Sequence, residues 1–231
     1  MFQRILVPLD GSVRAEQAFP VAVRIAHATG ASLTLLRVVE SPNRFDEHSV
    51  ELPEEPAELL EAEIARAKAY LLHVLAESKL EGIGITTEVR TGVVAQHILQ
   101  CVEEHQDDLI VMCSHGTTGL KRWLLGSVAQ KIVHTSPVPV LIVREGHALL
   151  IEQQGVTKEP FQILVPLDGS ALAEAALLPA AHMSAALAAP QSGALHLVQV
   201  VEPIAVMGDI TGAVAELKQE AMLWMRSYLK G

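Results

Sequence analysis

The stretch most suited to chemistry lies at residues 113–128 and reads CSHGTTGLKRWLLGSV. Gly116 and Gly126 stand in it with nine residues between them, and Ser127 follows the second glycine. A lysine and an arginine are its only charged side chains, although the formal net charge of the whole chain is -10 at pH 7. Glycines let backbone N–H groups approach an anion, and a helix starting near Ser127 would add unpaired N–H donors. The stretch therefore predicts an anion-binding loop.

Other interpretations of these residues are simpler. The stretch is also typical of a strand–loop–helix connection, with Ser127 capping the helix and exposed bases favouring solubility. The P-loop, the Gly-x-Gly-x-x-Gly motif and the esterase Gly-x-Ser-x-Gly motif do not occur. Ser114 precedes His115, but adjacency in a loop supplies no orienting carboxylate for a nucleophile. The histidines and cysteines lack the common metal-binding spacings, so we expect neither a catalytic residue nor a dedicated metal site.

A repeat divides the chain. The octapeptide ILVPLDGS occurs at residues 5–12 and again at 163–170. An alanine-rich helical pattern containing Ala-Glu follows each copy, and then an apolar run that ends in Val-Val-Glu. Repeated segments in matching context indicate homologous units. We predict a complete domain at residues 1–146, a linker at 147–160 and a partial second domain at 161–231.

The first unit alternates between strand and helix patterns, which predicts a parallel α/β sheet with right-handed crossovers and helices on both faces. The expected strands are Ile5–Pro8, Leu33–Val39, Ile85–Arg90, 108–113 and Val138–Val143. The expected helices are Val13–Thr29, ended by Gly30, then Ala57–Lys79, Val94–His105 and one that begins near Ser127. Short apolar strands are typical of a sheet covered on both faces.

The second unit repeats only the first half of this pattern. Its expected elements are a strand at Ile163–Pro166, a helix after Ser170, a strand at Leu195–Val201 and a helix at Val214–Leu229. No second copy of the glycine-spaced stretch follows. An incomplete sheet leaves a strand edge to be covered.

Topology places a carboxylate opposite the glycine-spaced loop. In a doubly wound five-stranded sheet of flavodoxin-like order 3-2-1-4-5, ligands bind at the carboxyl ends of strands one and four. Those ends are Asp10–Ser12 and Cys113–Gly116. The pairing suits a nucleotide, with Asp10 near the ribose or base and the loop at the phosphates. As an alternative, Asp10 caps the following helix, and both roles are compatible.

These features resemble the universal stress protein family, and in particular its tandem-domain members. Nucleotide-binding members carry Gly-x2-Gly-x9-Gly-Ser/Thr after the fourth strand. Here the second glycine is Gly116, the nine residues are Thr117–Leu125, and Gly126–Ser127 closes the motif. Cys113 stands where the motif has its first glycine, and Val94 stands where many members have proline.

The resemblance implies an ATP site, with Mg²⁺ held through the phosphates. VPLD at 7–10 places Pro8 and Asp10 at adenosine-contacting positions, and RVVE at 37–40 places the Val38 main chain at the adenine edge. Asp168 matches Asp10, but we expect no complete site in the second unit. The expected binding residues are Pro8, Asp10, Val38, Cys113, His115, Gly116, Thr117, Gly126, Ser127 and Val128.

The predicted function is that of a nucleotide-binding stress-response protein that acts as a binding or signalling module rather than a turnover enzyme. One alternative is a nucleotide-free structural interaction module, for which Cys113 is the discriminating feature. Another is a slow ATPase or autophosphorylating protein. The sequence identifies no general base for that chemistry.

Composition bears on partners and location. The acidic balance argues against non-specific nucleic-acid binding. Two cysteines are too few for a disulfide framework, and we expect no apolar run of about 18 residues that would span a membrane, so we expect a cytoplasmic protein. Family members dimerise through their last strands. Open edges at Val138–Val143 and Ile163–Pro166 therefore predict a homodimer or an exchanged-element assembly.

Overall fold

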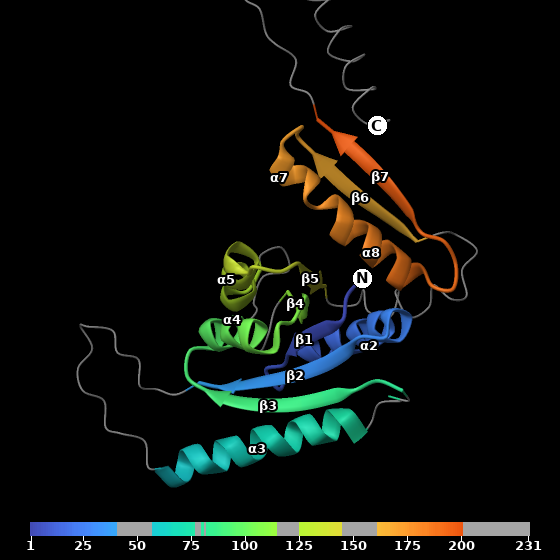
Figure 1. Ribbon diagram of the computed structural model, residues 1–231. Helices are drawn as coiled ribbons and strands as arrows, with labels where there is room; N and C mark the ends of the chain where they lie inside the picture. Colours follow the sequence, from blue (N-terminus) through green and yellow to red (C-terminus); the bar gives the residue numbers. More distant parts are fainter. Residues whose placement is uncertain (41–56, 77–79, 81, 115–124, 145–160, 201–231) are drawn as a thin grey trace, which may run out of the picture.

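The computed structural model describes residues 1–40, 57–76, 80, 82–114, 125–144 and 161–200, and the observations that follow concern these residues. The first unit is built on a five-stranded parallel sheet in the order β3-β2-β1-β4-β5 (Figure 1). This confirms the predicted flavodoxin-like order. The strands are β1 (Arg4–Pro8), β2 (Ser32–Val39), β3 (Ile85–Thr91), β4 (Leu109–Cys113) and β5 (Val140–Val143).

Helices cover both faces of this sheet. Along β1, Ile5 and Val7 belong to the core beneath α2 (Ala18–Thr29) and α3 (Ala57–Ala76). Leu6 points to the other face and packs with α4 (Val94–His105) and α5 (Ser127–Thr135). All three β1 side chains are fully buried. The two-residue period of a strand therefore divides β1 between two cores.

The predicted helix over Val13–Thr29 is wrong in one respect, because it is two helices. The short α1 (Val13–Glu16) ends before α2 begins at Ala18. Pro20 is the reason, since it lacks the N–H that would donate to the Glu16 carbonyl and its ring crowds that position. Gly30 ends α2 as predicted, in the left-handed conformation at φ 74°.

Other boundaries shift slightly. The last strand begins at Val140 rather than Val138, because Pro139 has no N–H for a ladder hydrogen bond. The long helix is described to Ala76. Its predicted end at Lys79 and the predicted helix at Val214–Leu229 lie outside the described residues.

The second unit repeats the strand–turn–helix arrangement of the first. A two-stranded parallel sheet of β6 (Gln162–Leu167) and β7 (Ala194–Gln199) packs on α8 (Leu177–Ala188), with the short α7 (Ala171–Glu174) before it. The strand predicted to reach Val201 is described only to Gln199. Pro179 is the third residue of α8, as Pro20 is of α2. The repeated sequence thus gives the same local break between helices.

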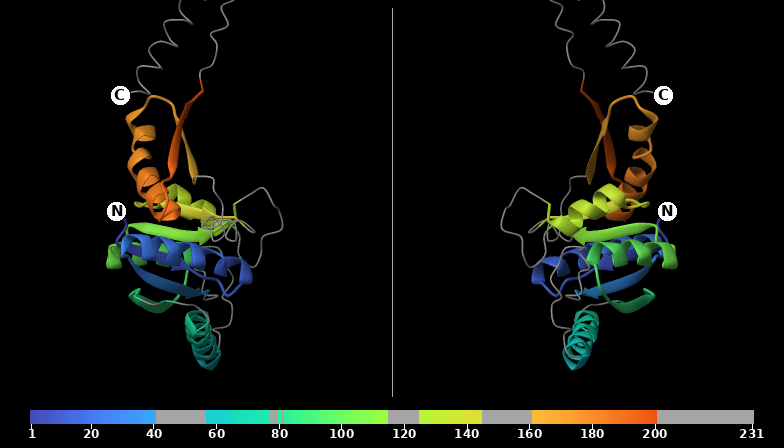
Figure 2. Two further views of the ribbon diagram at one scale, coloured as in Figure 1. Left: turned by 90° about the vertical axis from the view of Figure 1, so that its right-hand side faces the viewer. Right: turned by 90° about the vertical axis from the view of Figure 1, so that its left-hand side faces the viewer.

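The second unit contacts the first mainly through α8, which lies beside α2 (Figures 1 and 2). Ala186 and Leu187 of α8 belong to the same buried cluster as the α2 side chains. The Arg24 guanidinium donates to the Ala189 carbonyl at 3.5 Å. The rings of Phe2 and His182 meet edge to face at 5.9 Å. The half unit therefore docks on the first domain by a helix face rather than by joining its sheet.

One apolar stretch differs from the prediction made from the sequence. Residues 171–188, which comprise α7 and α8, are long and apolar enough to cross a membrane by length and composition, whereas we expected no such run. The stretch is broken at residues 175–176, and α8 packs on β6, β7 and α2. These contacts are those of a helix layered on a sheet.

Candidate functional site

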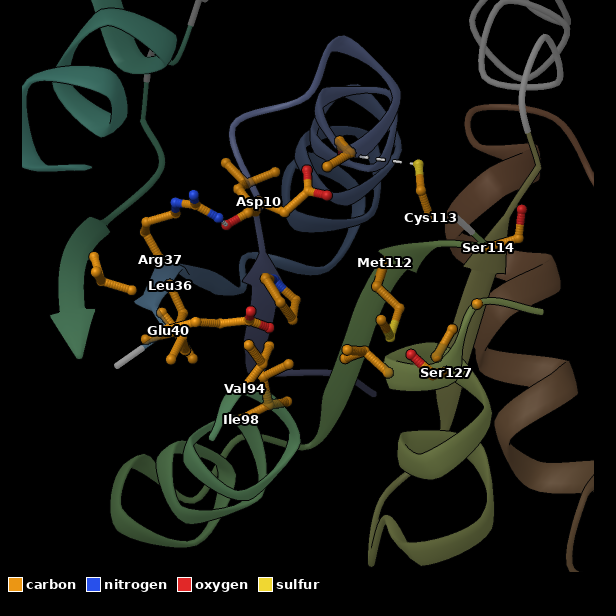
Figure 3. Close-up of a pocket in the computed structure, with 18 of the residues that line it drawn as sticks. Asp10, Leu36, Arg37, Glu40, Val94, Ile98, Met112, Cys113, Ser114 and Ser127 are labelled. Atoms are coloured by element: carbon orange, nitrogen blue, oxygen red, sulfur yellow. Dashed lines mark hydrogen bonds between the residues drawn. The ribbon is translucent and has the colours of Figure 1, made fainter. Parts of the chain in front are cut away.

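A cavity opens at the carboxyl ends of β1, β2 and β4, where the strand order reverses direction (Figure 3). Its volume is about 510 Å³, within the range of small-molecule sites. Seven of the ten predicted binding residues line it: Pro8, Asp10, Val38, Cys113, Gly126, Ser127 and Val128. His115, Gly116 and Thr117 lie outside the described residues.

Asp10 is positioned by a tight turn after β1. Its Oδ1 accepts hydrogen bonds from the Ser12 backbone N–H at 2.9 Å and from the Ser12 hydroxyl at 2.6 Å. Gly11 between them has φ 83°, a conformation that side chains disfavour. Ser12 in turn accepts from Ala15 N–H and is the N-cap of α1. The alternative of Asp10 as the helix cap is thus wrong, since Asp10 orients the residue that does the capping.

Hydrogen bonds connect the end of β4 to α1 and to β5. The Cys113 thiol donates a hydrogen bond to the Arg14 carbonyl oxygen at 2.7 Å, and Figure 3 shows the sulfur turned toward α1. Ser114 N–H donates to the Val143 carbonyl at 3.0 Å. The Ser114 carbonyl accepts from Gly126 N–H at 2.8 Å. The two ends of the predicted anion loop are therefore joined directly.

The start of α5 supplies donors to the cavity. Gly126 is the N-cap, and its carbonyl accepts the first helical bond, from Gln130 N–H. Ser127 is the first helical residue, so the alternative of Ser127 as the N-cap is wrong. The N–H groups of Ser127, Val128 and Ala129 have no acceptor within the helix. The Gly126 N–H is already bound to the Ser114 carbonyl, so among residues 126–129 the N–H groups open to an anion are those of Ser127, Val128 and Ala129.

Val38 presents its main chain toward the β1 side of β2. Leu9 N–H donates to the Leu36 carbonyl, whereas Gly92 N–H donates to the Val39 carbonyl on the β3 side. Along a strand, the N–H and C=O groups of successive residues point to opposite neighbouring strands. Those of Val38, two residues after Leu36, therefore point to the β1 side as those of Leu36 do. The β1 ladder ends at Pro8 and Leu36. The Val38 amide and carbonyl therefore face the cavity just beyond the last strand pairing.

Several lining residues were missed by the sequence analysis. The floor is apolar, with Leu36, Val94, Ile98 and Met112 contributed by β2, α4 and β4. In the sequence these residues follow the apolar patterns of ordinary strand and helix cores, so the patterns gave no signal of a cavity. Arg37, Glu40 and Glu63 add charged groups. An apolar floor with charged groups and N–H donors suits a ligand that is part flat ring and part anion.

The described lining of the cavity holds three carboxylates, those of Asp10, Glu40 and Glu63, and Tyr70 lies outside it. Burial, reinforced by the nearby carboxylates of Glu16 and Asp10, raises the pKa of Tyr70 above its ordinary value. That phenol therefore stays protonated at neutral pH. Ser114 is buried, and His115 lies outside the described part of the chain.

The sequence model of the universal stress protein family matches residues 1–144. A universal stress protein of Methanocaldococcus jannaschii is 34% identical over 148 residues, which are 63% of this chain and 84% of the relative. One from Bacillus subtilis is 34% identical over 149 residues, 62% of this chain and 100% of the relative.

Solved structures show the same fold. Universal stress protein UspA from Lactobacillus plantarum matches with a TM-score of 0.51 at 31% identity, over 62% of this chain and 98% of that one. A universal stress protein from Archaeoglobus fulgidus matches 95% of this chain and 74% of its own, with a TM-score of 0.64 at 22% identity. Because its identity is low, the second match shows similarity of fold alone. That similarity covers both units of this chain.

Proposed function

Because the chain belongs to the universal stress protein family, we propose that it is a stress-response module whose cavity binds an adenine nucleotide, ATP in particular. The observation that carries this proposal is the meeting of three groups around one cavity of about 510 Å³. The start of α5 would hold phosphates, Asp10 the ribose and the Val38 main chain the base edge. Mg²⁺ would enter with the phosphates.

Cys113 is the residue on which the nucleotide-free alternative depends. A side chain at this position of the motif would block a ligand if it filled the cavity. The thiol instead lies 2.7 Å from the Arg14 carbonyl oxygen and is turned toward α1. This geometry favours a cavity that stays open to nucleotide.

The direct experiment is to purify the full chain, denature it and analyse the released small molecules by chromatography, followed by calorimetric titration of the emptied protein with ATP. We expect a bound adenine nucleotide, or saturable ATP binding at a single site. ATP that stays unhydrolysed over the titration would favour a binding module over a slow ATPase. A chain that neither retains nor binds adenine nucleotides would contradict the proposal.

Asp10 provides the first mutational prediction. Asp10→Ala is expected to weaken ATP and ADP by a similar factor, since the contact lies away from the γ-phosphate. A lost hydrogen bond to a charged group is worth about 1.5–3 kcal/mol, which corresponds to roughly 10–150-fold in affinity. Calorimetric titration with both nucleotides measures the factor.

Asp168→Ala is the matched control. Asp168 makes the same turn in the second unit, where Ser170 N–H donates to its Oδ1 at 2.8 Å, and the hydrogen bonds from Ser170 lower the pKa of its carboxyl. Asp168 does not line the cavity. The control loses the turn but should keep its nucleotide affinity. A tenfold loss on Asp168→Ala would place a binding site in the second unit.

Assembly is the second part of the proposal. Among the described residues, β3, β5, β6 and β7 each pair on one side only, so one chain offers four open strand edges, β5 and β6 among them. Leu164 of β6 is 62% exposed and leaves an apolar side chain on the open face of that sheet. Open apolar edges favour association, and a second copy of this chain offers edges of the same kind.

Light scattering of the full chain at low micromolar concentration is therefore expected to give about twice the monomer mass of 24.8 kDa. Leu164→Lys should shift the equilibrium toward monomer, because a charge would be buried in the interface. The exposed position tolerates lysine in the folded monomer. A monomer mass for the unsubstituted chain would contradict the assembly proposal.

A further inference from the structure

A cluster of metal-ligand side chains lies apart from the nucleotide cavity, between β3 and the end of α4. One donor atom each from Glu88, Cys101 and His105 lies within 4.8 Å of the others. Cys101 and His105 are four residues apart on α4, which places them on one face of that helix. Glu88 reaches them from β3. None of the three lines the cavity.

The distances are close to those of a shared ion. His105 Nε2 lies 3.0 Å from Glu88 Oε2, and Cys101 Sγ lies 3.7 Å from the same oxygen. In a tetrahedral zinc site with bonds of about 2.0–2.3 Å, ligand atoms lie roughly 3.3–3.6 Å apart. Shifts of well under 1 Å in these two distances would match them to a zinc site. The side chains of Glu88 and His105 are 28% and 37% exposed, so solvent can reach the cluster.

Asp107 is an independent observation that points to a cation. It follows α4 and is only 3% exposed, yet neither carboxylate oxygen has a hydrogen-bond partner among the described residues. Its charge interacts with Cys101, His105 and Glu88. A buried carboxylate without hydrogen bonds is costly unless a positive charge compensates it. Asp107 lies outside the group of ligand atoms within 4.8 Å of one another, so it would favour a bound cation by its charge rather than as a ligand.

The net charge of the groups around the cluster is negative, which favours a divalent cation. Four carboxylates, those of Glu88, Glu104, Asp107 and Asp108, interact in this region with two guanidinium groups, those of Arg4 and Arg90. Arg90 Nε donates to Glu88 Oε1 at 2.5 Å and so leaves Oε2 directed toward Cys101 and His105. Two negative charges remain uncompensated among these groups before the thiol ionises.

We propose that Glu88, Cys101 and His105 bind a divalent transition-metal ion of the zinc class, with solvent in the fourth position and the Asp107 carboxylate adding negative charge nearby. Thiolate, imidazole and carboxylate together favour zinc over magnesium or calcium, which prefer oxygen ligands alone. Binding transfers the thiol proton to solvent, so affinity rises with pH. The ion ties the edge strand β3 to α4 and stabilises the first unit independently of nucleotide.

The test is a titration of the metal-free full chain with Co²⁺ as a spectroscopic probe, at constant pH and without nucleotide. We expect one Co²⁺ per chain, with thiolate-to-cobalt charge-transfer absorption that Zn²⁺ abolishes by displacement. Zn²⁺ alone should raise the midpoint temperature of unfolding. Because no nucleotide is present, failure here leaves the proposed function untouched, and failure of ATP binding leaves this proposal untouched.

Variants identify the ligands. Cys101→Ser is expected to remove the charge-transfer absorption, whereas Cys113→Ser, at the chain's other cysteine, should retain it. Cys101 is fully buried, so His105→Gln serves as a second variant at a partly exposed position and should weaken Co²⁺ at least tenfold. His97→Gln on the same helix is its control. The proposal would be overturned if Co²⁺ did not bind saturably, or if the absorption depended on Cys113 instead of Cys101. The cluster would then be an ion-pair network.

Discussion

Replacing Gly126 with valine is expected to abolish measurable ATP binding while the fold is retained. The Gly126 backbone has φ -61° and ψ 155°, an extended conformation that valine adopts readily. Its own N–H stays bound to the Ser114 carbonyl, so the substitution acts through space. The branched side chain would occupy the approach to the N–H groups at the start of α5.

The expected loss is large. Micromolar affinity corresponds to about -8.2 kcal/mol, and two or three lost hydrogen bonds to a charged phosphate cost about 1.5–3 kcal/mol each. Most of the binding free energy would be removed. Calorimetry measures the loss, and circular dichroism checks that the variant is folded. Gly126→Ala, with its single methyl group, should give an intermediate loss. An unchanged affinity in folded Gly126→Val would remove the start of α5 from the phosphate site.

The second large effect concerns stability, and the repeat provides its control. Leu6 and Leu164 occupy the same place in the two copies of ILVPLDGS, yet Leu6 is 0% exposed and Leu164 is 62% exposed. Leu6 packs beneath α4 and α5. Leu6→Ala is expected to lower the free energy of unfolding by about 2–5 kcal/mol, because it leaves a cavity in that core.

At protein concentrations low enough to keep the chain monomeric, Leu164→Ala should change stability by only about 0.5 kcal/mol, as is usual for an exposed position. Urea unfolding followed by circular dichroism measures both variants. The measurement also bears on assembly. A cost at Leu164 that approaches the cost at Leu6 would show that the face of β6 is covered in solution, and its dependence on protein concentration would identify a second copy as the cover.

Much of the fold is determined locally by the sequence. The strand, the turn at Asp10 and the helix after Ser12 reappear around Asp168 and Ser170, because each depends on contacts within a few residues. The parallel sheet followed from alternating periods and right-handed crossovers, and its order was taken to be the flavodoxin-like order of doubly wound sheets. The position of the cavity followed from that order. Even the break between α1 and α2 was readable in Pro20, although our prediction overlooked it.

Other features needed the tertiary structure. The bond between the Gly126 N–H and the Ser114 carbonyl removes that N–H from the donors available to an anion, and a glycine spacing cannot reveal it. Arg37 and Glu40 belong to the cavity only because β2 ends beside β1. Cys101 and His105 share a helix face by spacing alone. Glu88 joins them only because α4 packs against β3.

The two octapeptides show most clearly what local sequence determines and what it does not. The same eight residues form the same strand and turn twice, so local sequence is sufficient for local structure. Burial differs completely between Leu6 and Leu164 because the covering layer, α4 and α5, comes from residues about 90 to 130 positions along the first unit. Among the described residues the second unit has no such layer. Secondary structure depends on near neighbours, whereas burial depends on which distant segments reach the same face.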